Sequence, residues 1–179
     1  MKIERKIILK TNKSHNIQNY SMVQKNNILL EQASELVSLE EFDEALRIYN
    51  KVLRSEPRNV GALIDKAVTL QRIGKNSQAV KLFDKVLKIK PKNIDALIGM
   101  GSTLHAQKKF SSAISYYDIA LSINPKFPVA IAYKGLALGE QGKIKDALSH
   151  FKRALAIDKN YDLAQISKEK ALELLKSKK

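Results

Sequence analysis

Residues 45–57 are ALRIYNKVLRSEP, and residues 79–91, 34 positions later, are AVKLFDKVLKIKP. The pattern returns at 113–125 as AISYYDIALSINP and at 147–159 as ALSHFKRALAIDK. Each stretch begins with alanine, has an aromatic residue four positions later and ends in proline, except that Lys159 ends the last one. A period of roughly 20 to 50 residues is the signature of stacked structural repeats. The sequence therefore predicts four copies of one unit over residues 26–161.

Each unit combines two helical patterns with a short turn between them. In the first unit, apolar or small residues recur at spacings of three and four, at Leu29, Ala33, Leu36 and Leu39. This spacing predicts an amphipathic helix over residues 27–39. After a turn at 40–41, the quoted stretch predicts a second helix that ends before its proline, because proline disfavours helical geometry in the preceding residue. We expect the units to span 26–59, 60–93, 94–127 and 128–161.

Small and large side chains alternate between the two helices of each unit. The first helix carries a column of small residues, at Ala33, Ala67, Gly101 and Gly135. The second helix carries the aromatic column, at Tyr49, Phe83, Tyr117 and Phe151. Small residues let paired helices approach closely, and the large rings fill the space between them. We therefore expect the two columns to pack together in a shared core.

Four features together resemble the tetratricopeptide repeat over residues 26–161. They are the small residue in the first helix, the alanine and aromatic pair in the second, the closing proline and the 34-residue period. This resemblance implies an all-α fold, a right-handed superhelical solenoid of antiparallel helix hairpins. The chain departs from the family pattern where tryptophan is typical, at Leu29, Leu63, Leu97 and Ile131. It departs again at Glu40 and Lys108, where glycine often closes the first helix.

The two flanks follow different patterns. Residues 1–25 hold six Lys and Arg residues against one acidic residue, which predicts a basic, flexible arm. Its residues Ile3, Ile7 and Ile8 would share one side of a short helix, so packing on this chain's groove or a neighbour's stays open. Residues 162–179 are expected to form a C-terminal capping helix over 162–176 and a basic tail. Asp162 is its expected N-cap, and the residues expected to face the fourth unit are Ala164, Ala171, Leu172 and Leu175.

The end helix and the arm also leave open a homodimer joined through either of them. A solenoid needs a last unit that is apolar on one side and polar on the other, which favours the capping role.

The composition argues against catalysis. The chain has no cysteine, and its histidines, His15, His105 and His150, lack the spacing that puts two metal ligands on one helix face. No glycine-rich phosphate loop follows a strand pattern, and no serine has a histidine and acid setting. We therefore expect no enzyme, no cofactor and no metal. The longest apolar run of the N-terminal arm covers only residues 7–9, so we expect a cytoplasmic protein.

The resemblance places residues of each first helix on the concave face of the solenoid. The candidate partner-binding groove comprises Leu30, Ile64, Asp65, Val68, Arg72, Asp95, Ile98, Ser102, His105, Tyr133, Leu136 and Glu140. Its large apolar members suit a peptide groove, and the alternative is that they pack between neighbouring first helices. The three acidic residues favour some basic character in the ligand. The same register places Gly99 at a further exposed inner position.

Members of the family that hold the C-terminal tails of the Hsp70 and Hsp90 chaperones carry a basic and amide clamp at defined inner positions. Two carboxylates require several charged donors. Counted from the first unit, these positions hold Leu30, Ser34, Asp65, Asp95 and Gly99; counted from the second, Ile64, Val68, Gly99, Val129 and Tyr133. The clamp is absent in both registers, so we do not expect such a tail as the ligand.

The formal net charge of +14 supports an alternative. Lysines and arginines cluster on the second helices at positions expected to face outward, and a summed positive field attracts nucleic acid or acidic proteins. The main expectation is a non-enzymatic scaffold that binds a peptide or helix of a partner protein in the concave groove. The alternative is nucleic-acid or acidic-protein binding through the basic arm and the convex face.

Overall fold

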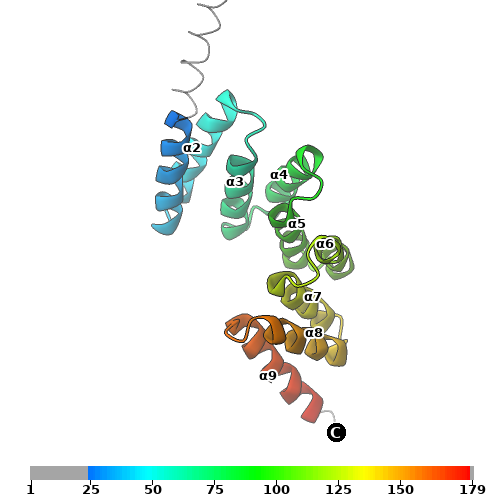
Figure 1. The fold of residues 1–179 in the computed structure, drawn as a ribbon. Helices are drawn as coiled ribbons and strands as arrows, with labels where there is room; N and C mark the ends of the chain where they lie inside the picture. The colour runs from blue at the N-terminus through cyan, green and yellow to red at the C-terminus, as the bar shows by residue number, and fades with distance from the viewer. Residues whose placement is uncertain (1–23, 178–179) are drawn as a thin grey trace, which may run out of the picture. The chain divides into compact units, whose positions relative to one another are not determined.

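The computed structural model describes residues 24–177, and within this range it contains nine helices and no strand. A helix over residues 24–38 is followed by α2 (Phe42–Ser55), α3 (Val60–Arg72), α4 (Asn76–Ile89), α5 (Ile94–Ala106), α6 (Phe110–Ile123), α7 (Pro128–Glu140), α8 (Ile144–Ile157) and α9 (Asp162–Lys176) (Figure 1). The expected all-α repeat of helix hairpins is confirmed. The predicted arm over residues 1–25, including its three isoleucines, lies outside the described residues except for residues 24 and 25.

The chain divides into two compact units within α3, one ending at Asp65 and the other beginning at Lys66. In the first unit, the helix over 24–38 and α2 enclose a core of Ala33, Ala45 and Tyr49. The side-chain amide of Asn26 donates hydrogen bonds to Ser55 Oγ (3.1 Å) and Glu56 Oε1 (2.7 Å), both at the C-terminal end of α2. The first hairpin therefore has an apolar centre, and hydrogen bonds join its two helices at one end.

In the second unit, helices that follow one another in the chain pack against one another, from α4 through α9. Helix α5 also contacts α7, and α7 also contacts α9. These additional contacts bring the first helices of successive hairpins together on one face of the unit. Helix α9 packs on α8 and α7, as a capping helix should.

The expected pairing of small residues with aromatic rings is confirmed in the second unit. A Cβ added at Gly101 would lie 2.4 Å from Cε1 of Tyr117, and one at Gly135 would lie 2.7 Å from Cε1 of Phe151. Gly99 makes the same kind of contact, because a Cβ there would lie 2.3 Å from Cζ of Phe83. Gly99 is buried, so the expectation of an exposed inner position was wrong.

Turns of one geometry close the first helix of every hairpin. Gly74 and Gly142 adopt φ of 74° and 77°, and Glu40 and Lys108 adopt φ of 62° and 59° in the matching turns. In the Lys108 turn, the Lys109 amide donates to the Leu104 carbonyl at 2.9 Å, the long backward bond that closes a Schellman motif. The backbone of the repeat is therefore maintained where glycine is missing.

Helices α3 and α5 begin with asparagine caps that the sequence analysis did not identify. The side chain of Asn59 accepts a hydrogen bond from the Ala62 amide (2.9 Å), and that of Asn93 accepts one from the Ala96 amide (2.8 Å). Each cap satisfies a helix N–H that otherwise has no partner. The proline two residues before each asparagine ends one helix, and the asparagine starts the next.

Three local expectations were wrong. Leu39 is 68% exposed, because the first helix ends at residue 38 and Leu39 lies in the turn. Leu172 is 37% exposed, because no further hairpin covers that side of α9 in the described chain. Asp162 is the first residue of α9 and Tyr161 is its N-cap, so the Asp162 carboxylate acts on the positive end of the helix dipole instead.

Candidate partner-binding surface

The twelve candidate groove residues fall in both units. Leu30, Ile64 and Asp65 belong to the first unit, and the other nine belong to the second. Leu30 is partly buried and packs against the core of Ala33, Ala45 and Tyr49. Leu30 therefore contributes to the core of the first hairpin.

The nine candidates in the second unit differ in how far they are exposed. Val68, Arg72 and Asp95 are exposed, and Val68 has 41% of its surface accessible. Ile98 is half-buried and contacts two core clusters, one around Leu97 and one around Tyr117. The expectation that Ile98 is not needed for packing was wrong, because it lies between neighbouring helices.

Four of the remaining candidates line one cavity of about 280 Å³, which we name the Tyr133 cavity. It is enclosed by side chains of α5, α6, α7 and α9, namely Ser102, His105, Tyr117, Tyr133, Leu136 and Leu163. The rings of Tyr117 and Tyr133 meet edge to face with centroids 5.9 Å apart. Burial of Tyr117, together with the neighbouring Tyr133, raises the pKa of its hydroxyl, so this tyrosine stays neutral under ordinary conditions.

The polar groups of the Tyr133 cavity are unequally satisfied. Ser102 accepts a hydrogen bond from Nε2 of Gln71 (2.9 Å) and donates one to the Gly99 carbonyl (3.1 Å). His105 packs edge to face on Phe110 at 5.2 Å, and among residues 24–177 its buried Nε2 has no hydrogen-bond partner. Ser102 is thus held by the fold, while His105 has a buried nitrogen that no hydrogen bond satisfies in the described chain.

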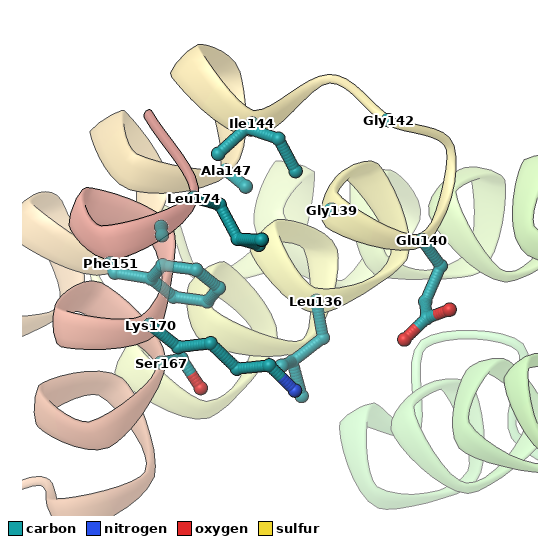
Figure 2. A pocket seen from close by; sticks show the side chains of 11 residues that line it. Leu136, Gly139, Glu140, Gly142, Ile144, Ala147, Phe151, Ser167, Lys170 and Leu174 are labelled. Carbon is teal, nitrogen blue, oxygen red and sulfur yellow. The ribbon is translucent and has the colours of Figure 1, made fainter. Parts of the chain in front are cut away.

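A second cavity, of about 370 Å³, lies between α7, α8 and α9, and we name it the Phe151 pocket (Figure 2). Its lining is Leu136, Gly139, Glu140, Gly142, Ile144, Ala147, Phe151, Ser167, Lys170, Ala171 and Leu174. Leu136 lines both cavities, so one side chain separates them. The structure therefore brings the candidates from α5 and α7 together on one surface with two adjacent hollows.

Two opposite charges lie at the edges of the Phe151 pocket. Figure 2 shows Lys170 extending from α9 over the pocket and Glu140 at the far edge, at the end of α7. Within the described residues, neither has an ion-pair or hydrogen-bond partner, in contrast to Lys134, whose ammonium lies 2.6 Å from Asp118 Oδ1. Both charges are therefore available to a ligand.

Residues 24–177 were also compared with the requirements of a metal centre and of a membrane span. Between residues 24 and 177, no three His, Asp or Glu side chains gather as they would around a metal ion. In the same range, no helix combines the length and apolar character that a membrane span requires.

Comparison with family models identifies a matching repeat family. Residues 30–128 match the model described as "Psidin, N-terminal TPR repeats region", which is more than half of the chain. The chain belongs to the tetratricopeptide-repeat family. No curated protein sequence matches it significantly.

Solved tetratricopeptide-repeat structures share this fold. A MamA crystal structure has 24% identity and a TM-score of 0.69, and the match covers 83% of this chain and 81% of that chain. The structure titled "YrrB: a TPR protein with an unusual peptide-binding site" has 22% identity and a TM-score of 0.63, covering 83% and 76%. The first TPR of Spaghetti (RPAP3), bound to an HSP90 peptide, has 23% identity and a TM-score of 0.61, covering 65% and 92%.

The tetratricopeptide-repeat frame explains which site residues the sequence analysis missed. Helix α9 contributes Leu163 to the Tyr133 cavity and Ser167, Lys170 and Leu174 to the Phe151 pocket. These residues lie 34 positions after Val129, Tyr133, Leu136 and Glu140. The period itself could have found them, but the sequence analysis considers this helix as a cap or as a dimer contact and not as part of a groove. It occupies the place of the first helix of a fifth hairpin.

One difference within this frame lies at the Phe151 pocket. Tyr133 of α7 fills the space beside Tyr117, and Ser167 is its counterpart in α9, beside Phe151. A hydroxymethyl group is far smaller than a phenol ring. The pocket lined by Phe151 and Ile144 therefore remains unfilled, although the Phe151 ring itself is buried.

Proposed function

We propose that this chain is a non-enzymatic scaffold that binds a peptide or helix of a partner protein on the face formed by α5, α7 and α9. The observation that carries the proposal is the pair of adjacent cavities separated by Leu136. Paired apolar hollows with a few polar groups are what recognition of a peptide side chain requires. The peptide-bound RPAP3 structure and the peptide-binding site in the YrrB title support a similar use of this fold.

The HSP90 peptide in the RPAP3 structure does not transfer to this chain. The clamp positions of this chain include Asp65 and Asp95 in place of the basic and amide donors that two carboxylates need. Leu136 and Tyr133 offer apolar contact instead. We expect the partner to be selected mainly by its apolar side chains.

A display library of random dodecapeptides, panned on the full chain, tests the proposal. Leu136→Ala removes the wall shared by the two cavities, and Leu148→Ala is the matched control. Both leucines are partly buried against the cluster that contains Phe151, but Leu136 lines the Tyr133 cavity and the Phe151 pocket, whereas Leu148 lines neither. Both variants should lose similar packing energy, on the order of 2 kcal/mol or less at half-buried sites.

Peptides selected by the wild type should bind Leu136→Ala at least about tenfold more weakly, and should bind Leu148→Ala normally. Circular dichroism melts of both variants show whether the comparison is between folded proteins. The proposal is wrong if no peptide is enriched, or if the enriched peptides bind all three proteins equally.

One observation favours the alternative of nucleic-acid or acidic-protein binding on the convex face. Residues 66–177 hold 20 Lys and Arg residues against nine acidic ones, whereas residues 24–65 hold five against eight. The positive charge is therefore concentrated in the second unit. A fluorescent single-stranded oligonucleotide should then bind with an affinity that falls steeply with salt, as counterions are released from phosphates. The absence of binding at low salt would remove nucleic acid as the partner in this alternative.

A further inference from the structure

We propose that the Phe151 pocket takes one large apolar side chain of the partner and that Lys170 binds a carboxylate next to that side chain. This inference rests on the proposed function and specifies the chemistry of its ligand. It assigns α9 a direct part in recognition in addition to its capping role. The occupant is a segment of another protein in which an aromatic or leucine-sized residue is adjacent to an acidic residue.

The shape of the pocket supports the apolar half of the proposal. Its volume of about 370 Å³ lies at the lower end of the range of ligand sites, about 300 to 1,000 Å³. Phe151, Ile144 and Leu174 form its apolar walls (Figure 2). Leu174 is 39% exposed at the edge, so its apolar surface is left without a cover in the described chain. An inserted side chain would remove that surface from water, which favours binding.

The charges support the acidic half. Lys170 extends over the pocket and has no partner in the part of the chain that the structure describes. Glu140 lies at the opposite edge, so the two ends of the pocket differ in sign. The surrounding unit carries 20 basic residues against nine acidic ones, which adds a field that attracts anions. The acidic neighbour is therefore expected at the α9 side of the bound segment.

This inference differs from one expectation from the sequence. Asp65, Asp95 and Glu140 were taken to favour a basic ligand, but only Glu140 lines the pocket. Lys170 lines it as well and was not counted. The balance at this pocket then includes one charge of each sign, within a strongly positive unit.

The test uses three capped hexapeptides as probes against the full chain: Gly-Ser-Asp-Phe-Ser-Gly, Gly-Ser-Lys-Phe-Ser-Gly and Gly-Ser-Asp-Ala-Ser-Gly. Binding is followed in two-dimensional amide NMR spectra, in which even weak affinities are measurable. We expect the peptide with aspartate and phenylalanine to shift the amide signals of Gly139 and Gly142, which line the pocket. The other two peptides should bind at least about threefold more weakly, because each lacks one of the two interactions.

Variants of the pocket test the apolar half and the acidic half of the proposal separately. Lys170→Gln should weaken binding of the aspartate and phenylalanine peptide about threefold, and Glu140→Gln should strengthen it, because a like charge is removed. Ser167→Tyr should abolish binding, since a phenol ring beside Phe151 would occupy the pocket. The charge effects should shrink in about 0.5 M salt as the charges are screened.

The outcomes separate this inference from the proposed function. Shifts at Gly139 and Gly142 with the expected order of peptides and variants support the inference. Equal binding of the lysine and aspartate peptides, or no binding of any of the three, overturns it. If panning still yields peptides that depend on Leu136, the scaffold function stands while this ligand chemistry is rejected. If no selected peptide depends on Leu136, the proposed function itself fails.

Discussion

The left-handed turn residues show how the repeat backbone dominates single-residue preferences. Lys108 has φ of 59° in the turn where the fourth hairpin has Gly142 at φ 77°. In both turns an amide reaches back to a carbonyl five residues earlier, from Lys109 to Leu104 (2.9 Å) and from Lys143 to Leu138 (3.0 Å). A Cβ in this conformation costs roughly 1–2 kcal/mol, so the turn at Lys108 contains strain that its counterpart lacks.

Exchanging the two kinds of residue should therefore have opposite effects on stability. Lys108→Gly should raise the free energy of unfolding by up to about 1 kcal/mol, because relief of the Cβ strain outweighs the added freedom of the unfolded chain. Gly142→Ala should lower it by about 1 kcal/mol, purely through backbone strain, since nothing lies within 4 Å of the added Cβ. Urea unfolding measures both. A destabilised Lys108→Gly variant would show that the lysine side chain contributes more than its strain costs.

Residue identity alone predicted the core well where the 34-residue period applies. Gly101 meets Tyr117 and Gly135 meets Phe151 as expected, because a Cβ at either glycine would overlap the ring at its present position. Gly99 was misassigned because the family's inner register treats that position as exposed, while the Phe83 ring is in close contact with it. The exact depth of a ring depends on three-dimensional packing, which a periodic pattern does not determine.

At the scale of the helices, the sequence predicted the hairpins and missed part of the site. Proline and glycine signals placed the helix ends to within a few residues, because these residues restrict the backbone locally. Helix α9 was predicted correctly over residues 162–176, yet its contribution of Ser167 and Lys170 to a cavity was not foreseen. A cavity forms where the side chains of neighbouring helices leave space unfilled. That property depends on α7, α8 and α9 together.

The repeat pattern suggests a way to fill the Phe151 pocket. Ser167→Tyr would place in α9 the residue that α7 has at the matching position, where Tyr133 meets Tyr117 edge to face. We expect the variant to melt at a higher temperature, with a gain of about 1 kcal/mol from buried ring surface and ring contact. Ser167→Ala is the control, since it removes the hydroxyl without filling the space. An equal or lower melting temperature for Ser167→Tyr would show that the pocket cannot accept a ring.

At the scale of the whole chain, charge is distributed unevenly along the sequence, so the net charge does not describe each unit. The sequence gives a net charge of +14, but the first unit carries more acidic than basic residues over 24–65. The excess of basic residues over 66–177 must therefore destabilise the second unit by repulsion, to an extent that salt can reduce. Composition alone could predict the sign of this effect. It could not indicate which lysines approach one another, because that depends on how α3 and α4 pack.

Lys66 and Lys85 identify one such pair in the second unit. Burial lowers the pKa of the Lys66 ammonium below its usual value, and the charge of Lys85 lowers it further. A lysine whose pKa is lower in the folded state than in the unfolded state opposes folding while it is charged, and this penalty is present at neutral pH and disappears as the pH rises above the unfolded pKa. Lys85→Gln removes the second cause. It should therefore stabilise the protein at neutral pH.

The stabilisation by Lys85→Gln should depend on salt, and a control variant should separate the repulsion between Lys66 and Lys85 from the effect of net charge. In about 20 mM salt, Lys85→Gln should raise the free energy of unfolding by roughly 0.5 kcal/mol, and most of this gain should vanish in about 0.5 M salt. Lys81→Gln, on the same helix, lowers the net charge equally without removing the charge that acts on Lys66. The difference between the two variants then measures the repulsion itself. If both variants gain equally, the stabilisation comes from the overall charge of the unit, and the proximity of Lys66 and Lys85 has no measurable energetic consequence.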